Sequence, residues 1–263
     1  MLNNQFKKKP RILCLHGHAS SGKIFKEDMK NWPEIVLEKM DLVFLDAPFP
    51  TENSSLIGRF DPPYYEWFQD NEDHTVYKNF DQAVAYIEDH MIKWGPFDGV
   101  LGVSQGSTMT AALPGMQREG VAFTRVPKVK FLILISAYKL GGKTFSAPEL
   151  AKNAFSSPID IRSLHIIGEK DPTKCCNFEL LESFVNPTVL YHRGGHGVPN
   201  GLDENGVKIV LGFLNKIQTV LSEKENMSCE TSSPCCHYFD LVRSLFSRKR
   251  WTSMKNARIE NVA

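Results

Sequence analysis

A serine flanked by glycines lies between an apolar run and a helical pattern. The stretch GVLGVSQGS places Ser104 at the centre of Gly102-x-Ser-x-Gly106. Glycine at these two positions allows a serine to occupy a sharp strand-to-helix turn, where larger side chains would collide with the neighbouring strand and helix. The N–H groups and the dipole of the helix start then face the hydroxyl. The pattern predicts a nucleophilic serine, although a tight turn with an inert serine would look the same.

A nucleophilic serine needs a histidine and an acid, which in this arrangement follow it along the chain, each in a loop after a later strand. Asp171 comes just after the apolar run SLHIIG, and His196 lies in a glycine-rich loop after TVLYH. We therefore predict Ser104, Asp171 and His196 as the catalytic residues. The alternatives are Glu169 and Asp160 for the acid and His192 for the base. The other histidines are expected to have local structural roles or none.

The stretch LCLHGHASSGKIF (Leu13–Phe25) allows two interpretations. GHASSGK resembles a phosphate-binding loop, but that loop needs a hydroxyl directly after the lysine, and Ile24 stands there. The other interpretation is an oxyanion loop after an early strand. It predicts that the backbone N–H groups of Gln105 and His18 hold the oxyanion, with Ala19 as the alternative to His18.

Short apolar runs alternate with helical patterns along most of the chain. Runs without polar alternation are typical of parallel strands buried on both faces, so we predict an α/β fold with a mostly parallel twisted sheet and helices on both faces. The runs are Arg11–Leu15, Leu42–Leu45, Gly99–Val103, Lys130–Ser136, Ser163–Ile167 and Thr188–Tyr191. The clearest helix is Phe80–Trp94, with Asn79 as its N-cap, Gln82 at the capping-box position and Gly95-Pro96 after its end.

A long connection, Ala47–Thr75, interrupts this alternation and contains the aromatic stretch FDPPYYEWF. A loop of this length in a compact domain is usually functional or disordered, and aromatic residues need surfaces to pack on. Tyr64, Tyr65, Trp67 and Phe68 are candidates for the wall of an acyl pocket. Packing of the loop onto the core is the alternative.

Composition limits the class of protein. The chain has 263 residues, 42% of them hydrophobic, and a net charge of +1, so it can bury a substantial core and has no overall field to recruit nucleic acid. No stretch approaches the roughly 18 apolar residues needed to span a bilayer. The six cysteines lack the pattern of a secreted disulfide framework. We expect a soluble cytosolic protein, with the nucleus as the alternative compartment.

The predicted organisation is a flexible N-terminus (1–10), one catalytic domain (11–222) and a disordered tail (223–263) after a last helix, Asp203–Leu221. The tail contains CCHYFDLVRSLFSRKRW (Cys235–Trp251), in which apolar residues share a helical face beside basic ones. Such a segment can lie on an anionic membrane, and adjacent cysteines can be acylated. A disordered tail or a protein-docking helix is the preferred interpretation. The cysteines there lack ordinary zinc spacing.

Six stretches together resemble the FSH family of eukaryotic serine hydrolases, within the α/β-hydrolase superfamily, over about Pro10–Leu221. They are RILCLHGHASSG, LVFLDAPFP, FDPPYYEWF, GPFDGVLGVSQGS, LHIIGEKDP and GGHGVP. The resemblance implies an α/β-hydrolase fold without a large lid and an esterase or thioesterase. It also places a triad on Ser104, Asp171 and His196.

The mechanism expected from this triad is an acyl-enzyme on Ser104, and it needs no metal or organic cofactor. The expected substrate is a small acyl ester or thioester. A ligand-binding protein with weak turnover and a peptidase are the alternatives. Two features differ from the family: a polar histidine in HGHASSG, where family members often carry an apolar or aromatic residue, and the tail beyond Leu221.

Overall fold

The protein is built on a six-stranded, fully parallel sheet. The computed structural model describes residues 8–52 and 60–232, with the side chains of the last helix as far as Glu223. The strands follow the order β10-β9-β8-β7-β1-β2 across the sheet. Their bounds are β1 (Arg11–Leu15), β2 (Asp41–Leu45), β7 (Gly99–Val103), β8 (Phe131–Ile135), β9 (Arg162–Gly168) and β10 (Thr188–His192). All six predicted strands are present, with ends that differ by at most one residue.

Burial explains why these runs are strands. Every residue of β7 and β8 is buried, as expected for central strands covered on both faces, whereas β2 and β10 at the edges are partly exposed. The strand order reverses direction at β1, which pairs with β2 on one side and β7 on the other. In open parallel sheets such a switch point creates a crevice at the carboxyl ends of the strands. This is where the predicted serine and oxyanion loop follow β7 and β1.

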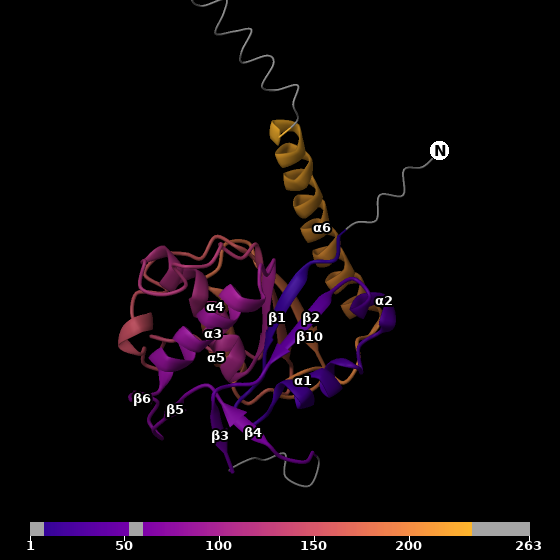
Figure 1. Ribbon diagram of the computed structural model, residues 1–263. Helices are drawn as coiled ribbons and strands as arrows, with labels where there is room; N and C mark the ends of the chain where they lie inside the picture. Colours follow the sequence, from indigo (N-terminus) through magenta and orange to yellow (C-terminus); the bar gives the residue numbers. More distant parts are fainter. Residues whose placement is uncertain (1–7, 53–59, 233–263) are drawn as a thin grey trace, which may run out of the picture. The chain divides into compact units, whose positions relative to one another are not determined.

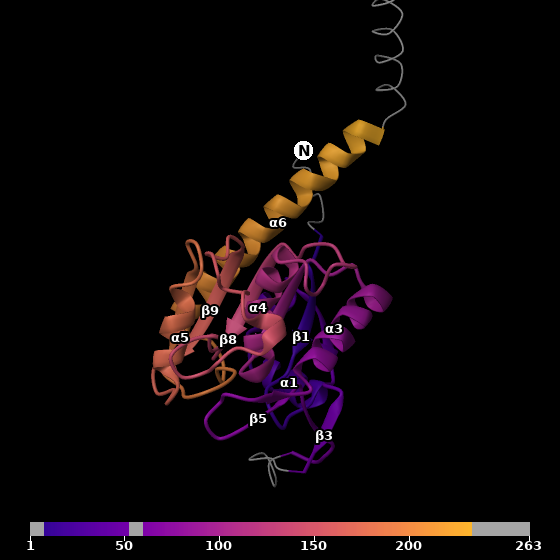
Figure 2. The same ribbon diagram turned by 90° about the vertical axis from the view of Figure 1, so that its left-hand side faces the viewer.

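Helices cover both faces of the sheet, as predicted. Figure 1 shows α3 and α4 on one face and α1 on the other, and Figure 2, which views the first face, shows α4 between α3 and α5. The helices are α1 (Gly22–Met29), α2 (Glu34–Leu37), α3 (Phe80–Trp94), α4 (Gln105–Arg118), α5 (Lys174–Leu181) and α6 (Glu204–Ser232), with a 3-10 turn at Glu149–Ala151. Near its start α6 contacts the sheet through Phe213, whose ring lies 6.0 Å from that of Phe131 in β8.

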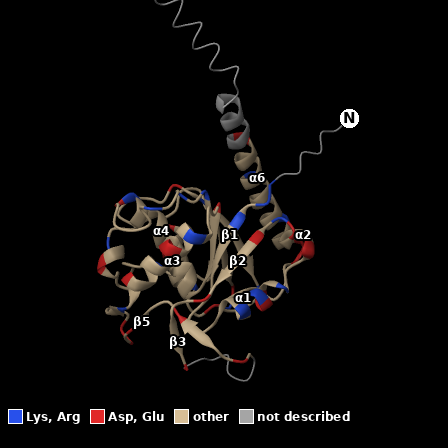
Figure 3. Ribbon diagram, viewed as in Figure 1, with Lys and Arg blue, Asp and Glu red and all other residues tan. Residues whose placement is uncertain are grey.

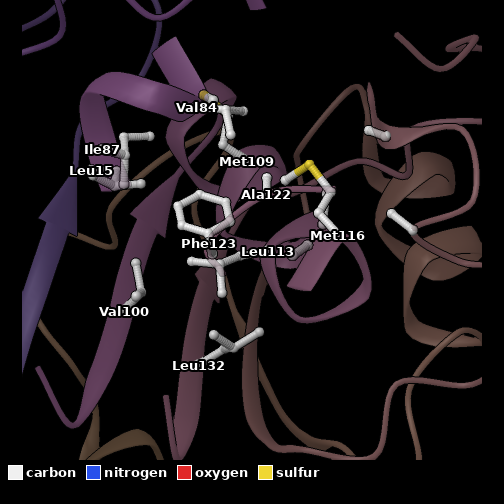
Figure 4. Close-up of a cluster of buried hydrophobic side chains, with 14 of the residues drawn as sticks. Leu15, Val84, Ile87, Val100, Met109, Leu113, Met116, Ala122, Phe123 and Leu132 are labelled. Carbon is white, nitrogen blue, oxygen red and sulfur yellow. The ribbon is translucent and has the colours of Figure 1, made fainter. Parts of the chain in front are cut away.

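The core between the sheet and the helices α3 and α4 is apolar and continuous. Figure 4 shows Phe123 surrounded by side chains from α3, α4 and the strands β1, β7 and β8. Complete burial of such a side chain stabilises the fold by roughly 1.5–3 kcal/mol relative to its exposed state. Because α4 begins directly after Ser104, this packing also fixes the turn that carries the serine.

The bounds of α3 agree with the prediction, but the capping does not. Asn79 precedes the helix with a left-handed backbone (φ 66°), and its side chain makes no capping hydrogen bond. Its amide instead donates to Gln69 Oε1 over 2.7 Å. This contact with β5 (Gln69–Asp70), in the hairpin just before the helix, therefore replaces the local cap that the sequence pattern suggested, so Asn79 and Gln82 do not form a complete capping box.

The long connection folds into two small antiparallel hairpins. One pairs β3 (Phe49–Thr51) with β4 (Tyr64–Glu66), and the other pairs β5 (Gln69–Asp70) with β6 (Tyr77–Lys78). Tyr65 also forms a bridge with Ser20, with N···O distances of 3.1 and 2.6 Å. The connection is therefore attached to the segment after β1 rather than extending freely from the domain.

The last helix is longer than predicted. It ends at Ser232 rather than at Leu221, so it includes residues 223–232, which the sequence analysis assigned to the tail. The rest of the predicted tail, including Cys235–Trp251, and residues 1–7 of the predicted flexible N-terminus lie outside the described residues.

Within the described ranges, no helix combines the length and hydropathy needed to cross a membrane. Both signs of charge occur along single elements such as α1 (Figure 3).

Candidate active site

Ser104 occupies the sharp turn that its flanking glycines predicted. It is the single residue between β7 and α4, and its backbone is strained, with φ 52° and ψ −118°. A Cβ atom at Gly102 would lie 2.5 Å from Ser107 Cα, and one at Gly106 would lie 2.3 Å from the carbonyl oxygen of Leu15. Both distances are too short for real atoms. Glycine at these positions therefore lets the helix start pack closely against β1 and β7 behind the serine.

The structure brings the three predicted side chains into one chain of hydrogen bonds. The hydroxyl of Ser104 donates to His196 Nε2 over 2.8 Å. On the other side of the ring, His196 Nδ1–H donates to the carboxylate of Asp171, at 3.0 Å from Oδ2 and 3.1 Å from Oδ1. This arrangement allows the imidazole to accept the proton of the hydroxyl while the carboxylate stabilises the resulting cation.

Asp171 is held as a carboxylate in a site closed to solvent. Its side chain is 0% exposed, and both the backbone N–H and the hydroxyl of Thr173 donate to Oδ1 over 2.8 Å. Burial alone would raise the pKa of Asp171, but the two hydrogen bonds from Thr173 and the charge of His196 outweigh it, so the pKa lies below its ordinary value. Thr173 also lies 3.2 Å from His196 Nδ1. The sequence reasoning did not single out Thr173.

Two close backbone contacts set the spacing of the acid and histidine loops. The N–H of Lys170 donates to the carbonyl of Gly194 over 3.0 Å. At Gly168, the last residue of β9, a Cβ atom would lie only 2.1 Å from the carbonyl oxygen of Gly195. A glycine at the end of a strand was a visible signal for such an approach, but the sequence reasoning missed it.

Ser136, which follows the neighbouring strand β8, holds the loop that carries His196. It directly follows β8, is 1% exposed and has a left-handed backbone (φ 51°). Its hydroxyl accepts a hydrogen bond from the N–H of Gly197, the residue after His196, over 3.0 Å. No sequence pattern marked this serine.

The alternative catalytic residues are placed differently. Glu169 and Asp160 are exposed, and the backbone of Glu169 bonds to the carbonyl of His192. His192 Nδ1 accepts from the N–H of Gly194 over 3.2 Å, and burial lowers the pKa of His192. Neither carboxylate accepts the Nδ1–H of His196, a role that Asp171 fills.

The segment after β1 lies beside the serine. A Cβ atom at Gly17 would lie 3.3 Å from Ser104 Cβ. Within the part of the chain that the structure describes, the backbone N–H groups of His18 and Gln105 donate to no other group, and Gln105 is the first residue of α4. The imidazole of His18 points elsewhere: its Nε2 lies 2.8 Å from Glu66 Oε2. Two N–H groups on either side of the serine are thus open to a ligand.

At the start of α1, where a phosphate-binding loop would hold its ligand, a carboxylate of the protein already accepts a backbone N–H. The N–H of Gly22, at the start of α1, donates to the carboxylate of Asp46 over 2.7 Å. A fixed carboxylate at this helix start would repel a phosphate. This agrees with the rejection of nucleotide binding from Ile24.

His16 is a buried structural histidine at the end of β1. Its Nδ1–H donates to the carbonyl of Gly17 over 2.7 Å, and its Nε2 accepts from the N–H of Ala47 over 2.9 Å. Burial lowers the pKa of His16 to about 4, so the ring is neutral at physiological pH. The two partners fix its tautomer, and the ring lies 5.3 Å from that of Trp67.

The aromatic segment is largely buried. Trp67 and Phe68 are 0% exposed and offer no surface to a substrate, so the prediction that they wall an acyl pocket is wrong, and core packing is correct for these two. Tyr65 is partly buried against the same core. Tyr64 is 5% exposed and also contributes to a cavity of about 880 Å³ between β3 and the segment before β4. Its lining residues are Pro50, Thr51, Glu52, Phe60, Asp61, Pro62, Pro63 and Tyr64.

No three His, Cys, Asp or Glu side chains converge as a metal site among the residues that the structure describes.

Comparison with known proteins gives a consistent family. Residues 5–206 match the FSH1 serine hydrolase family. Esterase FUS5 of Gibberella fujikuroi is 30% identical over 204 residues, covering 74% of this chain and 82% of that protein. Esterase CG5412 of Drosophila melanogaster is 26% identical over 235 residues, covering 85% of this chain and 80% of that protein. Esterase OVCA2 of Mus musculus is 28% identical over 210 residues, covering 72% and 89%.

Among solved structures, a carboxylesterase from Mesorhizobium loti has the same fold. It superposes with a TM-score of 0.51 at 15% identity and covers 79% of this chain and 89% of its own. The parallel sheet, the strained serine turn and the sequence match over most of the domain lead to one conclusion. The chain belongs to the FSH1 family of serine hydrolases, within the α/β-hydrolase fold.

Proposed function

We propose that this protein hydrolyses carboxylic esters or acyl thioesters through an acyl-enzyme on Ser104. The observation that carries the proposal is the chain of hydrogen bonds from Ser104 through His196 to the buried Asp171. Relatives of the same family that are named esterases support the reaction class. The assignment of the triad to these three residues is part of the proposal.

In the proposed mechanism, His196 Nε2 takes the proton of Ser104 as the serine oxygen attacks the substrate carbonyl carbon. Asp171 stabilises the imidazolium through Nδ1–H. The tetrahedral intermediate collapses to the acyl-enzyme, and His196 gives the proton to the departing alcohol or thiol. Water then attacks the acyl-enzyme and loses a proton to His196, which returns it to the oxygen of Ser104 as the carboxylic acid leaves.

The oxyanion of each tetrahedral intermediate is proposed to lie between the N–H groups of Gln105 and His18. Neither N–H group has a hydrogen-bond partner among the described residues, and the glycines around Ser104 keep the loop after β1 close to the helix start. Loss of one such donor typically costs about 3 kcal/mol of transition-state stabilisation. A polar residue at position 18 does not interfere, because its imidazole is paired with Glu66.

For the substrate we propose a modest apolar acyl chain. The cavity beside Tyr64 is mostly lined by proline and aromatic side chains, and its hairpin is attached to Ser20, which follows the oxyanion loop. Glu52 and Asp61 at the cavity disfavour an anionic acyl group.

The test is hydrolysis of a p-nitrophenyl ester series from acetyl to palmitoyl, with acyl-coenzyme A thioesters of the same chain lengths. Ser104→Ala should abolish turnover. Ser107→Ala is a matched control. The hydroxyl of Ser107 is buried in α4, the helix that begins directly after Ser104, and it has no hydrogen-bond partner among the described residues. Hydrolysis that survives Ser104→Ala would refute the proposal. Tight ligand binding by a wild type that does not turn over would favour the ligand-binding alternative.

A further inference from the structure

Trp67 is bonded to both sides of the proposed oxyanion hole, although it belongs to neither. Its indole Nε1–H donates to the carbonyl oxygen of His16 over 2.8 Å. Its backbone N–H donates to the side-chain Oε1 of Gln105, also over 2.8 Å. His16 lies two residues before His18, and Gln105 itself carries the other proposed donor.

Further hydrogen bonds close this network. The side-chain Nε2 of Gln105 donates to the carbonyl of Phe68 over 2.7 Å, so its amide binds two consecutive backbone groups of the aromatic segment. His16 in turn is fixed by its bonds to Gly17 and Ala47. Trp67 is 0% exposed, His16 is 0% exposed and Gln105 is 3% exposed. In such a dry environment these hydrogen bonds hold their geometry more strongly than they would in water.

The two segments that carry the proposed donors, the end of β1 and the start of α4, are also in close contact with each other. The start of α4 already packs against the end of β1, because a Cβ atom at Gly106 would lie 2.4 Å from the carbonyl oxygen of His16. The same carbonyl accepts the indole N–H of Trp67. Trp67 therefore bridges the end of β1 and the first residue of α4, which between them determine where the two N–H donors stand.

We infer that Trp67 is a positioning residue that sets the separation of the two oxyanion donors. The inference rests on the proposed function, since it assumes that the oxyanion binds between Gln105 and His18. Its role is distinct from that of an acyl-pocket wall, because a fully buried indole does not touch substrate. Displacement of catalytic groups by about 1 Å can lower a rate by about a hundredfold, so a network that fixes donors acts on the chemical step.

The test replaces Trp67→Phe, which removes the indole N–H, and compares it with Trp32→Phe. Trp32 is a matched control: it is 2% exposed, and its Nε1 has no hydrogen-bond partner among the described residues. Activity is measured with a p-nitrophenyl ester, the fraction of competent sites is counted by fluorophosphonate titration, and the affinity of an alkylboronic acid, which forms a tetrahedral adduct on the serine, is measured alongside.

For Trp67→Phe we expect kcat per competent site and boronic acid affinity to fall together, by about tenfold or more. KM and the midpoint of the pH–rate profile should not change, because the acyl site, His196 and Asp171 are untouched. Trp32→Phe should stay within about twofold of wild type in every measurement. A purely structural role for Trp67 would lower the competent fraction and leave kcat per site unchanged.

Wild-type kcat and boronic acid affinity in Trp67→Phe, or losses equal to those of Trp32→Phe, would overturn the inference while leaving the proposed function intact. If Trp67→Phe does not fold, benzothienylalanine at position 67 keeps the ring size without the N–H, and the same measurements apply. A wild type that neither hydrolyses esters nor reacts with fluorophosphonate would overturn the proposed function and this inference together.

Discussion

Gly168→Ala tests the spacing of the acid and histidine loops without changing a catalytic side chain. Gly168 ends β9, three residues before Asp171, and the added Cβ atom would lie 2.1 Å from the carbonyl oxygen of Gly195, next to His196. Real Cβ atoms do not approach closer than 3.0 Å, so the two loops must separate by about 0.9 Å. The contacting atom is a backbone oxygen, which cannot rotate away as a side chain would.

The size of the effect follows from this displacement. The hydrogen bond from His196 Nδ1 to Asp171 now measures 3.0 Å, and the bond from Lys170 N–H to Gly194 measures 3.0 Å. An increase of nearly 1 Å breaks either one. A misplacement of 1 Å can cost a rate factor of about 100, which corresponds to about 2.7 kcal/mol of transition-state stabilisation. We therefore expect kcat/KM for a short p-nitrophenyl ester to fall by about two orders of magnitude.

The assay compares wild type, Gly168→Ala and the control Gly212→Ala, with thermal unfolding measured for each. Gly212 lies in α6, where an added Cβ atom meets nothing within 4 Å, and alanine favours a helix. Gly212→Ala should keep full activity. Wild-type kcat/KM in a folded Gly168→Ala protein would refute the argument that this contact sets the distance between Asp171 and His196.

Two further predictions concern buried ionisable groups. Burial lowers the pKa of His165 from 6.5 to about 3, so between these pH values His165 is neutral in the folded protein but protonated in the unfolded chain. The free energy of unfolding should therefore decrease as the pH falls below 6.5. The contribution of this residue to the slope approaches about 1.4 kcal/mol per pH unit. Urea unfolding of His165→Leu should show that slope reduced, and an unchanged slope would contradict the assignment. Thr173→Val removes a hydroxyl that donates to Asp171 and thereby raises the pKa of Asp171. A carboxyl group with a lowered pKa stabilises the fold only at pH values above that pKa. The difference in free energy of unfolding between wild type and Thr173→Val should therefore shrink as the pH falls below 3.8, the ordinary pKa of an aspartic acid. A difference that stays constant to well below pH 3.8 would refute the prediction.

Much of the site followed from patterns that local physics dictates. Uninterrupted apolar runs indicated the buried parallel strands, and parallel strands place the loops after them at one edge of the sheet. The positions of Ser104, Asp171 and His196 could therefore be predicted from their order after three such runs. Gly102 and Gly106 also indicated close packing behind the serine, and this is confirmed because a Cβ atom at either position would collide with backbone atoms.

Other features depend on contacts between distant residues and left no readable signal. The partners of Trp67 are His16 and Gln105, and no spacing in the sequence connects these positions. For that reason the sequence suggested an acyl pocket where the structure has a buried network. Asn79 shows a related limit over a shorter range, since its bond to Gln69, ten residues earlier, replaces the expected cap. The polar composition after Ser222 suggested disorder, yet α6 continues to Ser232.

The most direct test of the proposed mechanism is to trap the acyl-enzyme. The protein is mixed with a p-nitrophenyl ester, quenched in acid within the first turnover, digested with trypsin and analysed by mass spectrometry. We expect the acyl mass on the peptide Trp94–Arg118, with fragment ions that place it on Ser104. Ester hydrolysis with the acyl group on another residue, or with no acyl-enzyme formed when deacylation is slowed, would contradict it.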